Sequence, residues 1–352
     1  MLKAAVIGVG SMGRNHARVY REMEDGVELV GVADTNAFTA AKVGGRFAVP
    51  YYADYVELLE NHQPDLVSLA VPTINHLEVG ADLIRRGIHV LIEKPIAGTL
   101  EQGQELIELA EQHGVVLAVG HIERFNPAIT ELRRRLREGM AGRIYQIHAQ
   151  RLSPYPARIR DVGVVIDLAS HDIDLFRFLM NEDIVRLYGE TLKTINSDRE
   201  DAFSGLMRFV SGAVGVLDVN WITPTKVRLL TITGARGMFR CDLITQELYF
   251  YENEIGPSQW DTLSILRGEN EGNVLGIRIQ RYEPLAAELE DFVGAVRDGR
   301  PPTITGKDSL ETLRLALEFV RSGKEVELIA RERAPALSPN GTSTDDHRTG
   351  SL

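Results

Sequence analysis

The sequence predicts an α/β chain in two parts: a doubly wound parallel sheet, then an α+β region with a mostly antiparallel, open-faced sheet. Three observations predict this. A glycine-rich turn at residues 8–13 lies between a strand and a helix, and short apolar strands then alternate with helices as far as His121. After His121, strands follow one another through short turns. We therefore expect an N-terminal Rossmann domain at residues 1–121 and a second α+β domain at residues 122–330.

The composition is that of a globular chain with an acidic surface. Its 352 residues include 39 Lys and Arg against 50 Asp and Glu, a formal net charge of −11. This balance argues against general nucleic-acid or membrane-surface binding, although a pocket can still be locally basic. Cys241 is the single cysteine, so no intrachain disulfide is expected. Because no apolar run reaches ~20 residues and strand residues follow Met1 too closely for a signal peptide, we expect a cytoplasmic protein.

The first turn is typical of a dinucleotide site. The strand at residues 3–7 runs into G-x-G-x-x-G, and a helix follows. Gly8 permits the tight turn, Gly10 lets the backbone approach a pyrophosphate, and Gly13 lets helix and strand pack closely. The free N–H groups and partial positive charge of the helix N-terminus then stabilise the phosphates.

The second strand, residues 28–33, ends in Asp34. This acid lies about 20 residues after the third glycine, where a carboxylate accepts the adenosine ribose hydroxyls. The same carboxylate repels a 2′-phosphate, so we expect NAD rather than NADP. Asp34 could instead cap a helix beginning near Thr35 and Asn36, and one carboxylate can serve both purposes.

The strand at residues 88–92 carries the residues around which we expect the site to form. It is apolar, follows Gly87, and ends in Glu93, Lys94 and Pro95. A charged pair does not fit inside a strand buried on both faces. We therefore expect Glu93 and Lys94 at the carboxyl edge of the sheet, where such sheets bind ligands. A plain surface ion pair is the alternative.

Two histidines also lie near strand ends. His76 begins the helix after the strand at residues 65–71, and His121 follows the strand at residues 115–119. Each could face the cofactor or pack within the fold, and the position of His121 favours a functional role. The candidate cofactor contacts are Gly8, Gly10, Ser11, Met12, Gly13, Asp34, Val71, His76, Glu93, Lys94 and His121.

Consecutive strands dominate the second part of the chain after a charged helix at residues 128–138. Short turns such as Ser211-Gly212 predict an antiparallel sheet with one open face, where subunits could pair as a homodimer or homotetramer. We expect strands at residues 144–152, 185–195, 202–210, 213–221, 227–233 and 237–241, and closing helices at 283–297 and 309–322. Residues 331–352, rich in Pro, Ser, Thr and Asp, predict a disordered tail.

One segment of the second domain combines acids with a histidine. Asp167, His171 and Asp174 are spaced i, i+4 and i+7, which places them on one face of a helix. A carboxylate one turn away can fix the tautomer of His171 and raise its basicity, so His171 is a candidate general base. The alternative is a polar helix face with an N-cap aspartate. No cysteine or second close histidine supports a metal, so we expect none.

Taken together, these motifs resemble the Gfo/Idh/MocA oxidoreductases, over about residues 1–330. The motifs are G-x-G-x-x-G at residues 8–13, Glu93-Lys94-Pro95, and Asp167-x-x-x-His171-x-x-Asp174. The resemblance implies an NAD-dependent oxidoreductase in which Lys94 and His171 face the reacting carbinol and Asp167 assists.

Three further segments resemble the UDP-N-acetylglucosamine 3-dehydrogenase branch of that family: residues 120–127 (GHIERFNP), 156–163 (PARIRDVG) and 220–228 (NWITPTKVR). That branch oxidises a sugar 3-hydroxyl to a 3-keto product, which implies a sugar-nucleotide substrate here. Arg151, Arg158 and Arg160 lie close together in the sequence of an acidic chain, and their guanidinium groups could bind a nucleotide diphosphate. The alternative is that they form interdomain salt bridges with Glu and Asp. The candidate substrate contacts are Lys94, Arg151, Arg158, Arg160, Asp167 and His171.

The chemistry we expect is hydride transfer from a sugar carbinol carbon to NAD, with loss of the hydroxyl proton. His171 takes the proton, and Lys94 hydrogen-bonds the oxygen. Burial would have to lower the pKa of Lys94 for it to exchange protons near pH 7, and Glu93 would oppose that shift. We therefore assign Glu93 to the cofactor ribose or to loop structure. One alternative is a dehydrogenase of a free polyol or sugar, as in inositol dehydrogenases. Another is a non-catalytic NAD-binding sensor, but the presence of both Lys94 and His171 argues against a sensor.

Replacing Asp34 with alanine is expected to weaken NAD more than NADP, because it removes both the ribose acceptor and the charge that repels a 2′-phosphate. Steady-state kinetics with the two cofactors, on the parent and on Asp34→Ala, measure the preference. A parent enzyme with higher kcat/KM for NADP would contradict the assignment.

Overall fold

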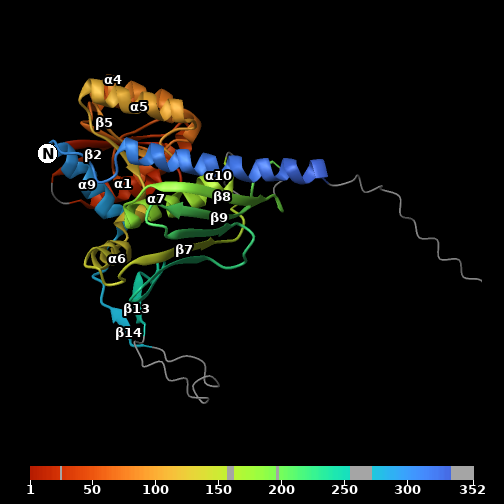
Figure 1. Ribbon diagram of the computed structural model, residues 1–352. Coiled ribbons are helices and arrows are strands. Elements are labelled where there is room, and N and C mark those ends of the chain that lie inside the picture. Colours follow the sequence, from red (N-terminus) through yellow and green to blue (C-terminus); the bar gives the residue numbers. More distant parts are fainter. Residues whose placement is uncertain (24–25, 157–161, 196–197, 254–271, 334–352) are drawn as a thin grey trace, which may run out of the picture.

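The computed structural model describes residues 1–23, 26–156, 162–195, 198–253 and 272–333, which form two β-sheets flanked by helices (Figure 1). The predicted fold class is confirmed. The first sheet has six parallel strands in the order β3-β2-β1-β4-β5-β6. Its strands are β1 (Leu2–Ile7), β2 (Val27–Ala33), β3 (Tyr51–Tyr52), β4 (Leu66–Leu69), β5 (His89–Glu93) and β6 (Leu117–Gly120). Its helices are α1 (Gly13–Glu22), α2 (Ala37–Phe47), α3 (Tyr55–His62), η1 (Thr73–Asn75), α4 (His76–Arg85) and α5 (Leu100–His113).

The local sequence explains where these elements begin and end. Strand β1 is central and covered on both faces, so it is apolar, with Ala4 and Val6 fully buried. Helix α5 begins where the Thr99 hydroxyl accepts the N–H of Gln102, and it ends at Gly114, whose φ of +63° suits glycine. Because all six strands are parallel, their carboxyl ends lead into loops on one edge of the sheet.

The second sheet has eight strands in the order β14-β13-β12-β11-β7-β10-β9-β8. Neighbouring strands are antiparallel except β7 and β10, which run parallel. Its strands are β7 (Ile144–Leu152), β8 (Ile184–Leu192), β9 (Ala202–Phe209), β10 (Val214–Asn220), β11 (Val227–Gly234), β12 (Gly237–Asp242), β13 (Glu247–Glu252) and β14 (Val274–Ile277). Strands β13 and β14 extend the sheet beyond the strands predicted from the sequence.

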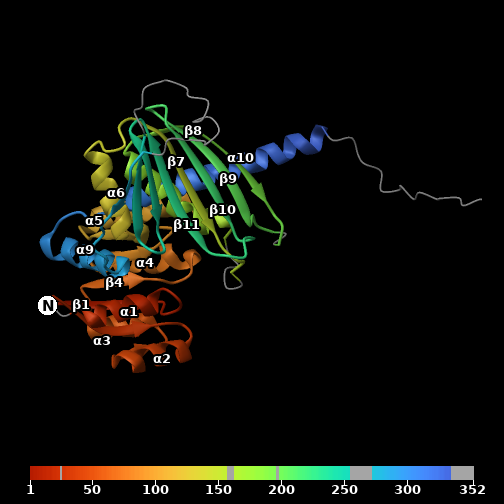
Figure 2. The same cartoon turned by 90° about the horizontal axis from the view of Figure 1, so that it is seen from below.

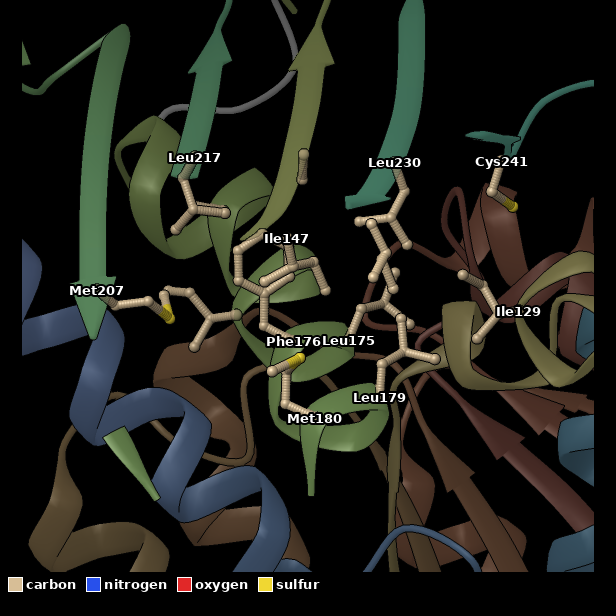
Figure 3. Close-up of a cluster of buried hydrophobic side chains, with 14 of the residues drawn as sticks. Ile129, Ile147, Leu175, Phe176, Leu179, Met180, Met207, Leu217, Leu230 and Cys241 are labelled. Carbon is tan, nitrogen blue, oxygen red and sulfur yellow. The ribbon is translucent and has the colours of Figure 1, made fainter. Parts of the chain in front are cut away.

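One face of the second sheet carries the core, and the other is open (Figure 2). Along β9 buried and exposed residues alternate: Phe203 and Met207 point inward, whereas Leu206 is half exposed. The inward side chains of the sheet meet Phe176 of α7 (Ser170–Met180), as Figure 3 shows for Ile147. The other elements near this sheet are η2 (Ile122–Phe125), α6 (Pro127–Arg137) and η3 (Val165–Ala169).

The last two helices return to the first sheet. Helix α9 (Pro284–Asp298) packs against α1, and its Leu289 and Phe292 join the same core as β1. Helix α10 (Gly306–Arg333) contacts α5 and β8, and Figure 1 shows it projecting past the second sheet. It continues beyond the predicted end at Ser322 and includes the first three residues of the predicted tail. The remainder of that tail, residues 334–352, lies outside the described residues.

Helix α9 also buries a carboxyl group against the first sheet. Glu288 is 2% exposed, and neither carboxyl oxygen has a hydrogen-bond partner. Burial raises the pKa of Glu288 well above its usual range, and the nearby carboxylates of Glu93 and Asp291 raise it further. The side chain is therefore kept neutral in the folded chain.

We expect Glu288→Gln to stabilise the protein increasingly as pH rises. Above about pH 4.3 an unfolded glutamate loses its proton, whereas folded Glu288 keeps it, so this residue favours unfolding more at each higher pH until its folded pKa is reached. Glutamine has the same shape and cannot ionise. Chemical denaturation at pH 5, 6.5 and 8 measures the difference in unfolding free energy.

The control is Glu290→Gln, an exposed glutamate on the same helix. It should leave the pH dependence of stability close to that of the parent. A Glu288→Gln variant whose stability difference is constant across this pH range would contradict a neutral buried carboxyl.

Candidate active site

A cavity of about 1410 Å³ is lined on one side by residues at the carboxyl edge of the first sheet and on the other by residues of the second sheet and its helices. It exceeds the roughly 300–1,000 Å³ of a pocket for one drug-sized ligand, so it has room for a cofactor and a substrate together. The first sheet contributes the glycine turn and the residues after β2, β4 and β5, and the second contributes η3, α7 and the ends of β7 and β11.

The glycine turn is shaped by two contacts that permit no side chain. A Cβ on Gly8, where φ is +83°, would lie 2.7 Å from the backbone of Ala70, and a Cβ on Gly13 would lie 1.8 Å from the carbonyl oxygen of Gly8. Gly10 differs, because a Cβ there would meet nothing within 4 Å. Gly8, Gly10, Ser11 and Met12 line the cavity beside the start of α1. This open, backbone-lined cradle fits the pyrophosphate of a dinucleotide.

Asp34 follows β2 at the same edge and also lines the cavity. Its Oδ2 accepts the N–H of Val9 at 2.9 Å, and its Oδ1 accepts the N–H of Asn36 at 2.9 Å. Helix α2 is capped by Asn36, whose side chain accepts the N–H of Thr39. A carboxylate has about four acceptor positions. Asp34 therefore holds the turn and keeps acceptor capacity on the cavity side.

Glu93, the last residue of β5, is held in place by a buried series of hydrogen-bonded side chains on α1 and β4. Its Oε1 lies 2.9 Å from His16 Nε2, His16 Nδ1 lies 3.1 Å from Ser68 Oγ, and that hydroxyl lies 2.9 Å from the Tyr20 hydroxyl. Burial acts to raise the pKa of Glu93, but His16 and Lys94 outweigh it and the net pKa is lowered. Glu93 therefore stays ionised in the cavity wall.

This hydrogen-bonded chain of side chains was not expected from the sequence, although the sequence contains a signal for it. His16 and Tyr20 are four residues apart on α1, so they share the face that packs on the sheet, and both are buried. Two polar side chains on a core-facing helix stripe need partners in the sheet. Ser68, in the middle of β4, is that partner.

Lys94 joins the two parts of the molecule. Its Nζ donates to the backbone oxygen of Asp167 at 2.5 Å and to Asp167 Oδ1 at 3.1 Å. Lys94 follows β5 of the first sheet, whereas Asp167 lies in η3, a π-helical turn that leads into α7. Both side chains line the cavity, and they are only 14% and 19% exposed.

The π-helical turn alters the arrangement expected for three residues predicted to share one helix face. Asp167 contacts Lys94, while Asp174 is buried in a bidentate pair with Arg124 at 2.6 and 2.7 Å. His171 lines the cavity on the first turn of α7, and its Nδ1 is buried without a hydrogen-bond partner. In the described structure, then, the Asp167 carboxylate does not bond His171 as we expected.

His171 is surrounded by positive charge. Burial is the largest cause that moves its pKa well below 6.5, and the cations of Lys94 and Arg151 lower it further. The imidazole is therefore neutral at pH 7 and able to accept a proton.

Of the three arginines predicted to bind substrate, the structure describes Arg151. It lines the cavity, and its guanidinium pairs with Glu123 at 2.8 Å and with Asp172 at 2.7 and 2.9 Å. Salt bridges therefore occupy much of its hydrogen-bonding capacity, but both partners lie within residues 122–330, so they are not the interdomain salt bridges considered as the alternative. Arg158 and Arg160 lie outside the described residues.

The two histidines left open by the sequence are both held within the fold. His76 is 1% exposed, and its ring nitrogens lie 2.9 Å from the Pro95 oxygen and 3.0 Å from the Val71 oxygen. His121 is 2% exposed, with Nε2 2.9 Å from Ser309 Oγ. Neither lines the cavity, whereas Val71 does. His76 thus links two of the loops that form the cavity wall.

Across the described ranges, no group of three or more His, Cys, Asp or Glu side chains is arranged to hold a metal ion. Nor does any helix in this part of the chain have the length and apolar character needed to cross a membrane.

Comparison with known proteins defines the class to which this fold and cavity belong. Residues 2–121 match the model of the oxidoreductase family with an NAD-binding Rossmann fold, and residues 129–240 match the Gfo/Idh/MocA C-terminal domain. The chain belongs to the Gfo/Idh/MocA family of oxidoreductases. The predicted family and the predicted cofactor, NAD, are both confirmed.

Among individual relatives, the chain is similar to UDP-N-acetylglucosamine 3-dehydrogenase from Acidithiobacillus ferrooxidans, with 30% identity over 90% of this chain and 96% of the relative. A solved structure of that enzyme matches with a TM-score of 0.82 and 29% identity, covering 92% of this chain and 98% of the other. The chain is also similar to scyllo-inositol 2-dehydrogenase (NAD(+)) from Bacillus subtilis, with 25% identity over 93% of this chain and 96% of the relative.

The glycine turn offers a matched pair of substitutions. Gly13→Ala should lower the free energy of unfolding by about 1–3 kcal/mol, because its methyl group overlaps the Gly8 carbonyl. Gly10→Ala should fold normally, because its methyl group meets open space, but it should weaken NAD by roughly tenfold or more because that space receives the cofactor. Thermal unfolding and NAD titration measure the two effects. Equal stability of the two variants, or unchanged NAD affinity in Gly10→Ala, would contradict this division.

Proposed function

We propose that the protein is an NAD-dependent dehydrogenase that oxidises the 3-hydroxyl of a UDP-N-acetylhexosamine to the 3-keto sugar nucleotide. The observation that carries the proposal is the convergence of Lys94, after β5, and His171, on α7, on one cavity that is also lined by the glycine turn. The similarity to UDP-N-acetylglucosamine 3-dehydrogenase over nearly the whole chain supports this substrate class.

The contacts around the cavity suggest a catalytic role for each of these residues. Bound NAD supplies the acceptor for the hydride of the carbinol carbon. His171, neutral at pH 7, takes the proton of the hydroxyl. Lys94 donates a hydrogen bond to the same oxygen and stabilises its developing negative charge. Asp167 holds the Lys94 ammonium in place across the cavity.

We assign the cofactor to the side of the cavity formed by the first sheet. Gly8, Gly10, Ser11 and Met12 would surround the pyrophosphate, and Asp34 would accept the adenosine ribose hydroxyls. Val71, Glu93 and Lys94 line the continuation of this wall. Substrate would then lie on the side of residues 122–330, which we propose as a separate substrate-binding domain.

A second candidate is oxidation of a free polyol, because scyllo-inositol 2-dehydrogenase is also similar over nearly the full chain. A substrate panel of UDP-N-acetylglucosamine, N-acetylglucosamine and inositols, with NADH formation as the readout, separates the two. Turnover of inositol without turnover of the sugar nucleotide would overturn the proposal.

We further propose that copies of the chain pair through the open face of the second sheet, as a homodimer or homotetramer. Tyr188 and Leu206 are opposite each other on β8 and β9, and they are 42% and 50% exposed. Neighbouring apolar side chains on a sheet face are a common feature of subunit interfaces. Sedimentation of the parent and of Leu206→Glu would report the oligomeric state.

Replacing His171 with alanine should lower kcat by about 10²–10⁴, the usual effect of losing a general base, while NAD affinity is retained. In the parent, the acid limb of kcat/KM should lie below pH 6.5, because the His171 pKa is lowered and the imidazole stays neutral until more acidic pH. His113→Ala, an exposed histidine on α5, is the matched control and should be silent. Near-normal turnover by His171→Ala would rule out this role.

Lys94→Ala should also lower kcat heavily, and Asp167→Asn should lower it less because the backbone oxygen of Asp167 still holds Lys94. The double variant Lys94→Ala/His171→Ala should raise the activation free energy by less than the sum of the two single increases, since both residues act on one oxygen and its proton. Full additivity would indicate that the two side chains act in separate steps.

A further inference from the structure

Arg228 is a cavity residue at the end of the segment 220–228, and it was not among the site residues expected from the sequence. It lies at the start of β11, directly across the ladder from Arg151 on β7, and both side chains line the cavity. Its Nη1 donates to the backbone oxygens of Leu152 and Val227, each at 2.7 Å. The guanidinium is thus anchored to the sheet in a fixed place.

The positive charge of Arg228 has no carboxylate partner within the described residues. Arg151 has Glu123 and Asp172, and Arg124 has Asp174, but no ion pair involves Arg228. Burial first, and then repulsion by Arg151, lowers the pKa of Arg228 to about 10, so the side chain is still cationic at pH 7. The carboxylates of Asp172, Glu123 and Asp167 act on Arg228 from a distance, but none pairs with it. A half-buried cation without an ion-pair partner is unfavourable, so the site is suited to an anion.

A second cation lies beside it. Lys226 is exposed, lines the same cavity two residues before Arg228, and has no ion pair in the described part of the chain. In a protein of net charge −11, two neighbouring cations on one cavity wall, neither with an ion-pair partner among the described residues, form a locally basic patch.

The patch belongs to the wall contributed by the second sheet, whereas the glycine turn belongs to the first. The charge of Arg228 lowers the pKa of His171, and the carboxylate of Asp167 raises the pKa of Arg228, so the three side chains are near one another. Lys226 directly precedes β11, and Arg228 is its second residue. The pyrophosphate of NAD already has the turn at Gly10 on the first sheet. An anion at Arg228 would therefore belong to the substrate.

We propose that Arg228 and Lys226 form an anion subsite that binds the diphosphate of the sugar-nucleotide substrate and so places its sugar against Lys94 and His171. The proposal rests on the proposed function and extends it, because it names the residues that distinguish a sugar nucleotide from a free polyol. A planar guanidinium with free N–H groups suits two phosphate oxygens, and the lysine adds a mobile point charge.

The test measures binding to the full-length protein saturated with NAD, which keeps phosphate ligands out of the cofactor site. Calorimetric titrations with UDP and with inorganic pyrophosphate should show Arg228→Gln binding each about 10- to 100-fold more weakly than the parent, the range for losing a charged hydrogen bond. Arg228→Lys should recover part of the loss, and Lys226→Gln should show a smaller one. Arg137→Gln, an exposed arginine on α6, is the control and should bind as the parent does.

Kinetics give the second readout. For UDP-N-acetylglucosamine, Arg228→Gln should raise KM by the same factor while kcat and the KM for NAD change little, because the residue holds the part of the substrate that does not react. A lowered kcat with unchanged KM would instead place Arg228 at the reacting sugar and overturn the subsite.

The outcomes separate this subsite from the proposed function. If the parent oxidises UDP-N-acetylglucosamine but Arg228→Gln binds UDP equally well, the subsite is wrong and the function stands. If UDP binding depends on Arg228 but no UDP-sugar is oxidised at its 3-hydroxyl, the function is wrong and the subsite stands. A parent that binds neither UDP nor pyrophosphate in the presence of NAD overturns the subsite outright.

Discussion

The contact between Lys94 and Asp167 is the interaction on which the arrangement of the site depends. One partner follows a strand buried in the first sheet, and the other lies in a π-helical turn beside the second. Both charges are largely removed from water, so each requires the other when no ligand is present. The relative placement of the two sheets is thereby coupled to the atoms that we propose handle the substrate oxygen.

Around this contact the charges are distributed unevenly, with a chemical consequence for His171. Lys94, Arg151 and Arg228 all act on the imidazole and lower its pKa, although Lys94 and Arg151 have carboxylate partners of their own. A histidine in such a field is unprotonated at rest and gives up a proton readily after accepting one. An anionic substrate would offset part of this field, so binding of its phosphates would favour the protonated imidazole that the reaction forms.

The features predicted from the sequence are those encoded over short distances. Alternating strands and helices, the glycine turn, and the position of Lys94 at a strand end each follow from periodicity and steric rules within a few residues. The missed features depend on distant partners: His16 and Glu93 are 77 residues apart, as Lys94 and Asp167 are 73 apart. The regular helix assumed for Asp167, His171 and Asp174 failed for a different reason, because a π-helical turn changes the spacing that i, i+4 arguments require.

The return of α9 and α10 to the first sheet has a consequence for how the protein is made. Leu289 and Phe292 belong to the core that contains β1, and Ile304 and Leu313 belong to the core that contains β5. The ribosome therefore delivers the first residues of the nucleotide-binding half long before the helices that complete it. During that interval the apolar surface next to β1 is not yet covered, so we expect nascent chains to need shielding until α9 and α10 have been synthesised.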